Sequence, residues 1–356
     1  MLFLLLYISL HYHHLFSSIM VSYLVLCLAV QAAFVAAQYE LRRTYNASNF
    51  AEKFRFVETA LENDPTGGFV NYVSHATAVS KGLFRVLDGT SDQGEDQIFI
   101  GVDNSTVLPS TSTGRDSLRL EALETIDVGL LIADIAHMPG NQCGIWPAFW
   151  TYNFQEDPIS EIDIIEGVGF QVDNTISLHT CDTCRFSAST DTTGTDLRTN
   201  CGLGGNCAST LNNGAGCGVT SPVNTASFGD EFNAVGGGVY ALQLEPGDGT
   251  DGILKIWNFE RDSIPFDITD GTPDPSSWGR PVVSFEQQNG GCEIGRIFHG
   301  QTLIINIEVC GEAFTDAVWQ GDEVCNKYSS CPSFISDNPE KLSDVYWLFN
   351  SIKLYS

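Results

Sequence analysis

Three carboxylates stand within one run of isoleucines, and their spacing could support acid–base chemistry. The run reads EIDIIE and contains Glu161, Asp163 and Glu166. Isoleucine-rich runs favour a buried β-strand, in which residues two apart share one face. Glu161 and Asp163 therefore point the same way, whereas Glu166 would point to the other face of a regular strand. A one-residue bulge at Ile164-Ile165 would return Glu166 to the first face, because bulges re-aim side chains beside active sites.

Carboxylates this close repel one another unless a proton or a cation lies among them. Acid pairs whose pKa values are pushed apart can cleave glycosidic bonds: one carboxylate attacks the sugar carbon and a protonated one donates to the leaving oxygen. Two such acids on one strand, roughly 5 to 5.5 Å apart if the bulge forms, indicate a retaining reaction through a covalent intermediate. The alternatives are a solvated strand edge and a calcium site built from oxygen ligands.

An aromatic run, WPAFW, precedes the acids and places Trp146 and Trp150 close to them. Indole faces stack on flat partners, and a sugar ring is one such partner. Both tryptophans are therefore candidate substrate-binding residues, with burial in the core as the alternative reading.

Together the two runs resemble the active-site region of glycoside hydrolase family 16. Its endo-β-1,3- and β-1,3(4)-glucanases, among them the fungal laminarinase-like ones, carry Trp-Pro-Ala-Phe-Trp followed by Gly-Glu-Ile-Asp-Ile-Ile-Glu. The resemblance extends over roughly residues 40–355. It implies that Glu161 is the nucleophile, that Asp163 assists it and that Glu166 is the general acid and base. We expect Trp150 to stack a donor sugar.

Two flanking segments add polar candidates. Residues 114–120 alternate polar and apolar side chains, which predicts a strand with Arg115 and Arg119 on one face. The resemblance implies that Arg119 lies near sugar hydroxyls; a salt bridge to the acid strand is the alternative. The run TISLHT predicts the hairpin partner of the acid strand with His179 at its end, and the resemblance implies that His179 lies near the acid/base, with a purely structural histidine as the alternative.

Many short strands separated by turn residues indicate an all-β sandwich. The resemblance implies a curved, concanavalin-like β-jelly roll with an open substrate cleft, and an open cleft implies internal cleavage of a polysaccharide. We expect a single catalytic domain over residues 38–356, since all-β domains often exceed about 200 residues as one unit.

The formal net charge of −27 argues against nucleic acid or an anionic membrane as a partner, because both require basic patches. Of eleven cysteines, Cys27 lies in an apolar leader, and the other ten could form up to five disulfides in an oxidising compartment. A zinc or redox pair at Cys181 and Cys184 lacks a second pair with suitable spacing. We therefore expect no metal and no cofactor.

Residues 1–37 read as a signal peptide that ends in small residues, with Met20 as an alternative start. The rival reading is an uncleaved signal anchor, because such a stretch is long enough to span a bilayer. Glycosylation sequons at Asn46 and Asn104 agree with secretion. We expect a secreted, extracellular monomer that has no contact with membranes once the signal peptide is removed.

These observations predict a secreted, retaining endo-β-glucanase that cuts β-1,3 and also mixed β-1,3-1,4 linkages. One alternative is a cell-wall glucan transglycosylase on the same fold, and another is a β-glucan-binding lectin, although such lectins typically lose the acids. The segment 153–160 departs from the family, since it lacks the tryptophan of Asn-Trp-Pro-x-Gly-Gly, and Ser160 replaces the glycine before Glu161. Linkage preference is therefore left open.

Overall fold

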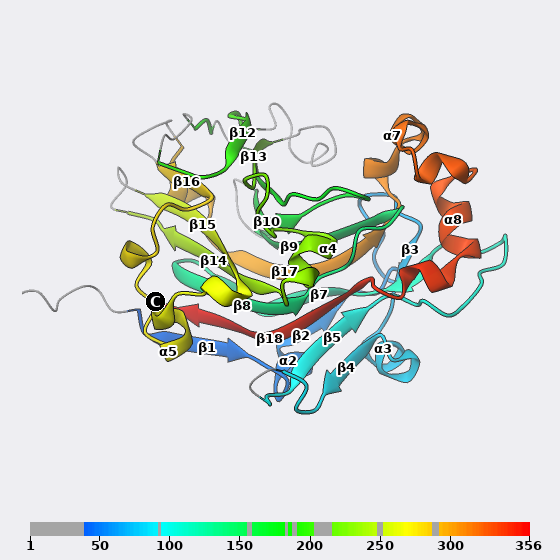
Figure 1. Ribbon diagram of the computed structural model, residues 1–356, viewed down its shortest axis with the longest axis horizontal. Helices are drawn as coiled ribbons and strands as arrows, with labels where there is room; N and C mark the ends of the chain where they lie inside the picture. The colour runs from blue at the N-terminus through cyan, green and yellow to red at the C-terminus, as the bar shows by residue number, and fades with distance from the viewer. Residues whose placement is uncertain are drawn as a thin grey trace, which may run out of the picture. The chain divides into compact units, whose positions relative to one another are not determined.

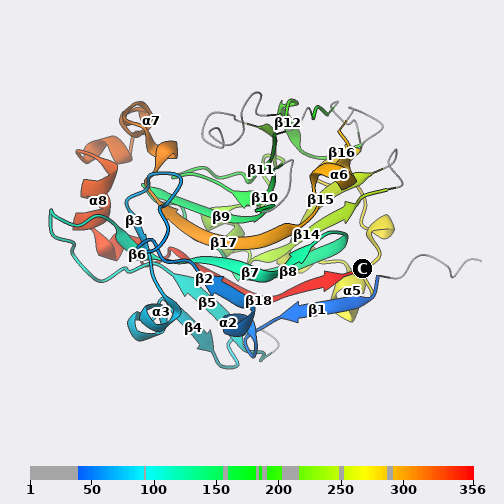
Figure 2. The same cartoon turned by 180° about the vertical axis from the view of Figure 1, so that it is seen from behind.

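Two antiparallel eight-stranded sheets packed face to face make up the fold (Figures 1 and 2). The computed structural model describes residues 39–91, 94–154, 159–181, 184–186, 191–202, 216–247, 252–286 and 292–356. Nearly all of them belong to the second of two units, Glu40–Ser356. The predicted signal peptide, Met20 and Cys27 lie outside the described residues.

The first sheet has the strand order β16-β15-β14-β8-β18-β5-β4, with β1 paired to β18. Its strands are β1 (Leu41–Tyr45), β4 (Phe84–Leu87), β5 (Gln97–Gly101), β8 (Gly129–His137), β14 (Gly238–Glu245), β15 (Ile253–Glu260), β16 (Val283–Glu286) and β18 (Tyr346–Tyr355). The second sheet has the order β12-β13-β11-β10-β9-β17-β7-β2. Its strands are β2 (Phe54–Phe56), β7 (Arg119–Ile126), β9 (Ile145–Tyr152), β10 (Ser160–Glu166), β11 (Thr175–Thr180), β12 (Thr195–Arg198), β13 (Cys217–Thr220) and β17 (Gln301–Val309).

One hydrophobic core lies between the sheets. Isoleucines of β10 and aromatic side chains of β9 and β18 belong to the same buried cluster. Phe149 of β9 meets Phe349 of β18 with ring centroids 5.8 Å apart, so the contact crosses from one sheet to the other. The open sheets confirm the predicted all-β jelly-roll sandwich, and they do not close into a barrel.

Short helices decorate the sandwich. The α-helices are α2 (Phe50–Lys53), α3 (His75–Lys81), α4 (Gly229–Ala234), α5 (Phe266–Asp270), α6 (Ile294–Ile297), α7 (Asp316–Gly321) and α8 (Cys331–Asp337). The 3-10 turns are η2 (Arg261–Ser263), η3 (Pro275–Ser277), η5 (Glu312–Phe314), η6 (Cys325–Lys327) and η7 (Pro339–Leu342). Among the helices described, none is long and apolar enough to cross a membrane.

The predicted strand over residues 114–120 is wrong in one respect, because the chain breaks there into two strands. The first, β6 (Arg115–Ser117), pairs in parallel with β3 (Val70–Tyr72) in a small separate sheet. Its Arg115 is fully buried and donates hydrogen bonds to the backbone carbonyls of Asp103, Thr106 and Ile335. Arg115 therefore does not share a face with Arg119, which begins β7 in the large sheet.

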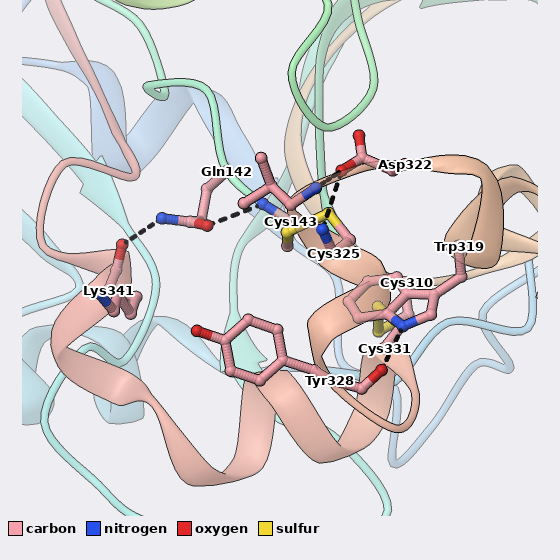
Figure 3. Close-up of a disulfide and its surroundings, with 10 residues drawn as sticks. Gln142, Cys143, Cys310, Trp319, Asp322, Cys325, Tyr328, Cys331 and Lys341 are labelled. Atoms are coloured by element: carbon pink, nitrogen blue, oxygen red, sulfur yellow. Dashed lines mark hydrogen bonds between the residues drawn. A yellow bond between two sulfur atoms is a disulfide. The ribbon is translucent and has the colours of Figure 1, made fainter.

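Residues 312–342, which follow β17, form a helical cap at one end of the sandwich (Figures 1 and 2). Two disulfides fix this cap: Cys143–Cys325 joins it to the residues before β9, and Cys310–Cys331 joins it to the end of β17 (Figure 3). Figure 3 also shows Asp322 accepting a hydrogen bond from the backbone N–H of Cys325, at 2.8 Å. The cap is thus covalently tied beside β9, which pairs with the acid strand, and to β17, the next strand of the same sheet.

Two further disulfides, Cys184–Cys292 and Cys201–Cys217, lie in the long connections. Cys181 is disulfide-bonded as well. Neither Cys181 nor Cys184 is therefore free to bind zinc, and the zinc alternative fails. Cys207 lies outside the described residues.

Candidate active site

The acid strand carries the predicted bulge. In the pairing of β10 with β9, Asp163 lies opposite Trp150 but Ile165 lies opposite Phe149, so one extra residue stands between them. Ile162, Ile164 and Ile165 are all fully buried in the core between the sheets. Glu161, Asp163 and Glu166 therefore emerge from the other side of the strand, which we call the acid face. The bulge allows two consecutive isoleucines to remain in the core without sending Glu166 after them.

Burial controls the protonation of these acids. Loss of solvation, followed by the charge of Asp163, raises the pKa of Glu161 to about 8. Burial also raises the pKa of Asp163 well above its ordinary range, with Glu166 as the next cause. It raises the pKa of Glu166 too, although a hydrogen bond from Trp146 opposes the shift. The three acids therefore share protons at pH values where isolated carboxyls have lost theirs.

His179 lies beside the acids, because β11 is the hairpin partner that the sequence predicts. It stands directly opposite Glu161 in the pairing of β10 with β11. Its Nε2 is 3.3 Å from Oδ2 of Asp163 and 4.0 Å from Oε1 of Glu161. A protonated imidazole here would favour ionised carboxylates, and its charge lowers the pKa of Glu161 against the effect of burial.

Glu161, Asp163 and His179 also offer three ligand atoms within 4.8 Å of one another, close enough to hold a metal ion. Calcium takes oxygen ligands only, so a set that includes an imidazole nitrogen does not match the calcium alternative. A set of two carboxylates and one imidazole suits a transition metal better. The same three groups can equally hold one another through shared protons.

The two predicted tryptophans lie on the acid face in different roles. Trp146 donates its indole N–H to Oε1 of Glu166 at 2.9 Å, so it holds one oxygen of this acid. Trp150 donates to Oδ1 of Asn306 at 2.8 Å. Because Trp150 is directly opposite Asp163 in the sheet, its ring stands next to the acids. Trp146 thus holds one oxygen of Glu166, while the ring of Trp150 lies beside the acids.

Arg119 lies over the ring of Trp150, with its guanidinium carbon 5.0 Å from the ring centroid. Its Nε donates to Glu121 of the same strand at 3.0 Å, and Glu121 also pairs with Arg55. Arg119 therefore forms its ion pair within β7. The alternative reading had placed a salt bridge between Arg119 and the acid strand. The charge of Arg119 nevertheless favours the ionised form of Glu161.

Residues 153–160 differ from the family pattern, and those of them that the structure describes leave the acids undisturbed. The side chain of Ser160 is fully buried, donates to the backbone carbonyl of Ile297 at 2.6 Å and accepts from Gln301 at 2.8 Å. Phe154 is 48% exposed and contacts Tyr152 at 4.8 Å between ring centroids. Residues 155–158 lie outside the described part of the chain.

Several site residues were missed by sequence reasoning. They are Tyr72, Tyr152, Arg198, Asn306 and Glu308. Tyr152 lies opposite Glu161, and burial together with that acid raises the pKa of its phenol to about 12. Asn306 and Glu308 alternate with isoleucine in β17, which is the same signal that revealed the acids. Tyr72 of β3 contacts Asn306 and Glu308, and the charge of Arg198 in β12 lowers the pKa of Glu166 against the effect of burial. Both come from distant strands and left no comparable pattern.

The two sequons lie away from the acid face. Asn46 follows β1, and its side-chain oxygen accepts a hydrogen bond from the hydroxyl of Ser48. Asn104 is exposed in the connection after β5. Their glycosylation stays a prediction.

Comparison with known proteins agrees with this geometry. A family model described as the XgeA-like catalytic GH16 domain matches residues 54–355. An endo-1,3(4)-β-glucanase of Arthroderma benhamiae is 36% identical over 331 residues, which are 93% of this chain and 67% of that protein. The endo-1,3(4)-β-glucanase xgeA of Emericella nidulans is 38% identical over 91% of this chain and 48% of its own length. The chain thus spans about half the length of the second relative.

Two solved structures are similar throughout the described fold. An elongating family 16 β-1,3-glucosyltransferase superposes with a TM-score of 0.76 at 37% identity, covering 89% of this chain and 100% of that one. Laminarinase 16A from Phanerochaete chrysosporium, solved with 6-O-glucosyl-laminaritriose in donor and acceptor sites, gives 0.78 at 33% identity, covering 90% and 100%.

Proposed function

Because the chain belongs to glycoside hydrolase family 16 and matches its XgeA-like catalytic domain, we propose that it is an endo-acting, retaining β-glucanase. Its substrates are β-1,3-glucans and mixed β-1,3-1,4-glucans. The observation that carries this proposal is the bulged strand β10, which brings Glu161, Asp163 and Glu166 to one face beside Trp150.

In this mechanism Glu161 attacks the anomeric carbon and Glu166 protonates the departing glycosidic oxygen. Both acids come from one strand, which suits the short separation that retention requires. Glu166 then takes a proton from a water molecule whose oxygen bonds to the anomeric carbon, and the bond between this carbon and Glu161 breaks, which releases the sugar. Asp163 lies between them in the strand, and it holds the nucleophile and tunes it through the charge that raises the pKa of Glu161.

The first step requires a proton on Glu166 and none on Glu161. The shared, raised pKa values supply the proton, since the buried trio retains protons near neutral pH. The charges of His179 and Arg119 favour the ionised form of Glu161. We assign the roles of nucleophile and acid by the positions of Glu161 and Glu166 in the strand. Trp146 holds one oxygen of Glu166 by a hydrogen bond.

The named relatives support the substrate class. The curated ones are endo-1,3(4)-β-glucanases, and the laminarinase structure holds a β-glucan oligosaccharide in donor and acceptor sites. Trp150, next to Asp163, would stack the donor sugar, and Arg119 would meet its hydroxyls. Disulfides throughout the described fold suit an oxidising compartment, which agrees with secretion as an extracellular monomer after removal of residues 1–37.

The test is reducing-end release by the purified protein on linear β-1,3-, mixed β-1,3-1,4-, β-1,6- and β-1,4-glucans. We expect the wild type to cut the two β-1,3-containing substrates and Glu161→Gln to cut none. Glu166→Gln should lose about 10²- to 10⁴-fold in turnover, because it can no longer donate a proton. NMR that identifies which anomer, α or β, is released first reports whether the configuration is retained.

A matched control is Glu124→Gln, which changes an exposed glutamate that pairs with Arg43 and Lys53 at the surface. It should leave the rate unchanged. Wild-type activity in Glu161→Gln would refute the assignment of the nucleophile.

Transfer to a second glucan is the alternative reaction, and the similarity to an elongating β-1,3-glucosyltransferase favours testing it. The glycosyl-enzyme would then react with a sugar hydroxyl in place of water. Incubation with laminari-oligosaccharides separates the two outcomes by product size. Products longer than the substrate indicate transfer, and products only shorter than the substrate indicate hydrolysis.

A further inference from the structure

The ring of Trp150 is held at its edge by a chain of hydrogen bonds that runs away from the acids into the protein. Its indole N–H donates to Oδ1 of Asn306 at 2.8 Å. The amide Nδ2 of Asn306 donates to the hydroxyl of Tyr72 at 3.1 Å, and this hydroxyl donates to Oε2 of Glu308 at 2.6 Å. The chain ends on a carboxyl group of β17, two residues beyond Asn306.

The direction of every hydrogen bond in this chain is determined by its first member. An indole nitrogen can only donate, so Asn306 must turn its oxygen to Trp150 and its NH₂ group to Tyr72. The hydroxyl of Tyr72 then accepts from Asn306 and has one proton left, which it gives to Glu308. Without the acceptor at Glu308, the hydroxyl of Tyr72 loses the hydrogen bond that fixes the direction of its proton.

The far end of the chain is enclosed. Tyr72 and Glu308 are each 2% exposed. Oε1 of Glu308 accepts from the backbone N–H of Val309 at 2.9 Å. A Cβ on Gly68 would lie 2.0 Å from that same oxygen, so the loop that contains Gly68 packs directly onto the carboxyl group. Burial and the nearby Asp64 raise the pKa of Glu308 to about 8.

We propose that Tyr72 and Glu308 are positioning residues that, through Asn306, set the plane of the Trp150 ring and thereby the affinity for the donor sugar. They touch neither substrate nor acids and act only through this chain. The link to sugar affinity rests on the proposed function, whereas the orientation of the ring does not.

The experiment compares four variants by kinetics and by NMR of the indole N–H groups. Tyr72→Phe removes the hydroxyl, and Glu308→Leu removes its acceptor. Glu308→Gln keeps an oxygen that can accept from Tyr72 and serves as the conservative rescue. Tyr240→Phe is the matched control: its hydroxyl is also fully buried, but it donates to the carbonyl of Ser227 and has no path to Trp150.

We expect Tyr72→Phe and Glu308→Leu to raise KM for laminari-oligosaccharides about three- to tenfold, the worth of one hydrogen bond, with kcat within about twofold. The Trp150 indole resonance, identified by its loss in Trp150→Phe, should shift in both variants. Glu308→Gln and Tyr240→Phe should keep the wild-type KM and the wild-type resonance, whatever their unfolding temperatures.

An unmoved Trp150 resonance in Tyr72→Phe overturns the proposal, and so does an equal shift in Tyr240→Phe. A shifted resonance with unchanged KM overturns the link to sugar affinity. If the wild type cuts no glucan, the proposed function fails by itself, and the indole resonances still decide whether Tyr72 and Glu308 position the ring.

Discussion

Glu161, the proposed nucleophile, is buried near like charges, and these surroundings make its ionised form unfavourable in the folded protein. Its pKa rises from the ordinary 4.5 to about 8, so the folded protein binds its proton more tightly than the unfolded chain does. A group of this kind contributes stability that is full below about pH 4.5 and is lost as the pH rises through about 8.

Glu161→Gln should therefore unfold at a higher temperature than the wild type at pH 8, and the difference should shrink toward pH 4. Each kcal/mol relieved corresponds to roughly 2–4 °C in a domain of this size class. Thermal unfolding followed by circular dichroism at both pH values checks the sign. A variant that is less stable at pH 8 than the wild type would show that Glu161 makes a net stabilising contact.

The pH dependence of catalysis follows from the same pKa values. In the proposed mechanism, catalysis requires one proton in the trio and an ionised Glu161, so activity should fall both when the trio is fully protonated and when it is fully ionised. Because burial raises the pKa of all three acids, both limbs of the kcat/KM profile should lie above the ordinary carboxyl range, the acid limb reporting ionisation of Glu161 and the alkaline limb loss of the proton from Glu166. An alkaline limb below pH 6 would contradict the shared-proton arrangement.

The common face of the three acids could be predicted from the sequence, but the residues that support Trp150 could not. Glu161, Asp163 and Glu166 belong to one strand, so their common face follows from the period of two and one bulge. Tyr72 and Glu308 lie 236 residues apart, and only the meeting of β3 with the edge of β17 brings them together. No local pattern encodes such a meeting.

At the scale of the element, the bulge in β10 makes a prediction about chain length. Deleting Ile164 would leave a regular strand in which Glu161, Asp163 and Glu166 still alternate with isoleucine on one face. We expect this variant to fold with a near wild-type unfolding temperature and to lose about 10²-fold in rate, because the acids shift by roughly 1 Å.

Deletion of Ile162 is the matched control. It would turn Asp163 toward the core and bury a carboxylate there without a partner, so we expect it not to fold stably. Circular dichroism and reducing-end release measure both variants. Equal damage from the two deletions would argue that the extra residue matters for packing and not for aiming Glu166.

Elements that are determined by the pattern of their own segment were also easier to predict than elements that are determined by contacts with a distant segment. The hairpin of β10 with β11, with His179 at the end of β11, followed from alternation, and the place of His179 near the acids followed from the family resemblance. The break between β6 and β7 did not, because Arg115 leaves the large sheet to bind carbonyl groups at the end of α8, which alternation within a segment does not reveal.

At the scale of the whole molecule, the two cap disulfides should contribute different amounts to the free energy of unfolding. Cys143–Cys325 spans 182 residues, and Cys310–Cys331 spans 21. In the chain-entropy account, removing the disulfide that closes the longer loop lowers the free energy of unfolding by about 5 kcal/mol, and removing the one that closes the shorter loop lowers it by about 3 kcal/mol. Paired cysteine-to-alanine variants, compared by denaturant midpoint, check this order. The reverse order would show that contacts inside the cap outweigh loop length.

The longer of these bridges has a further effect on how the molecule survives damage. A protease that cuts the backbone at any point between Cys143 and Cys325 produces two pieces that stay joined by that disulfide. Strands on either side of the cut also remain paired, since β17 lies beside β9 and both belong to one sheet. A nicked molecule would therefore migrate as one species on a gel until it is reduced, and among proteases it would persist as a single particle.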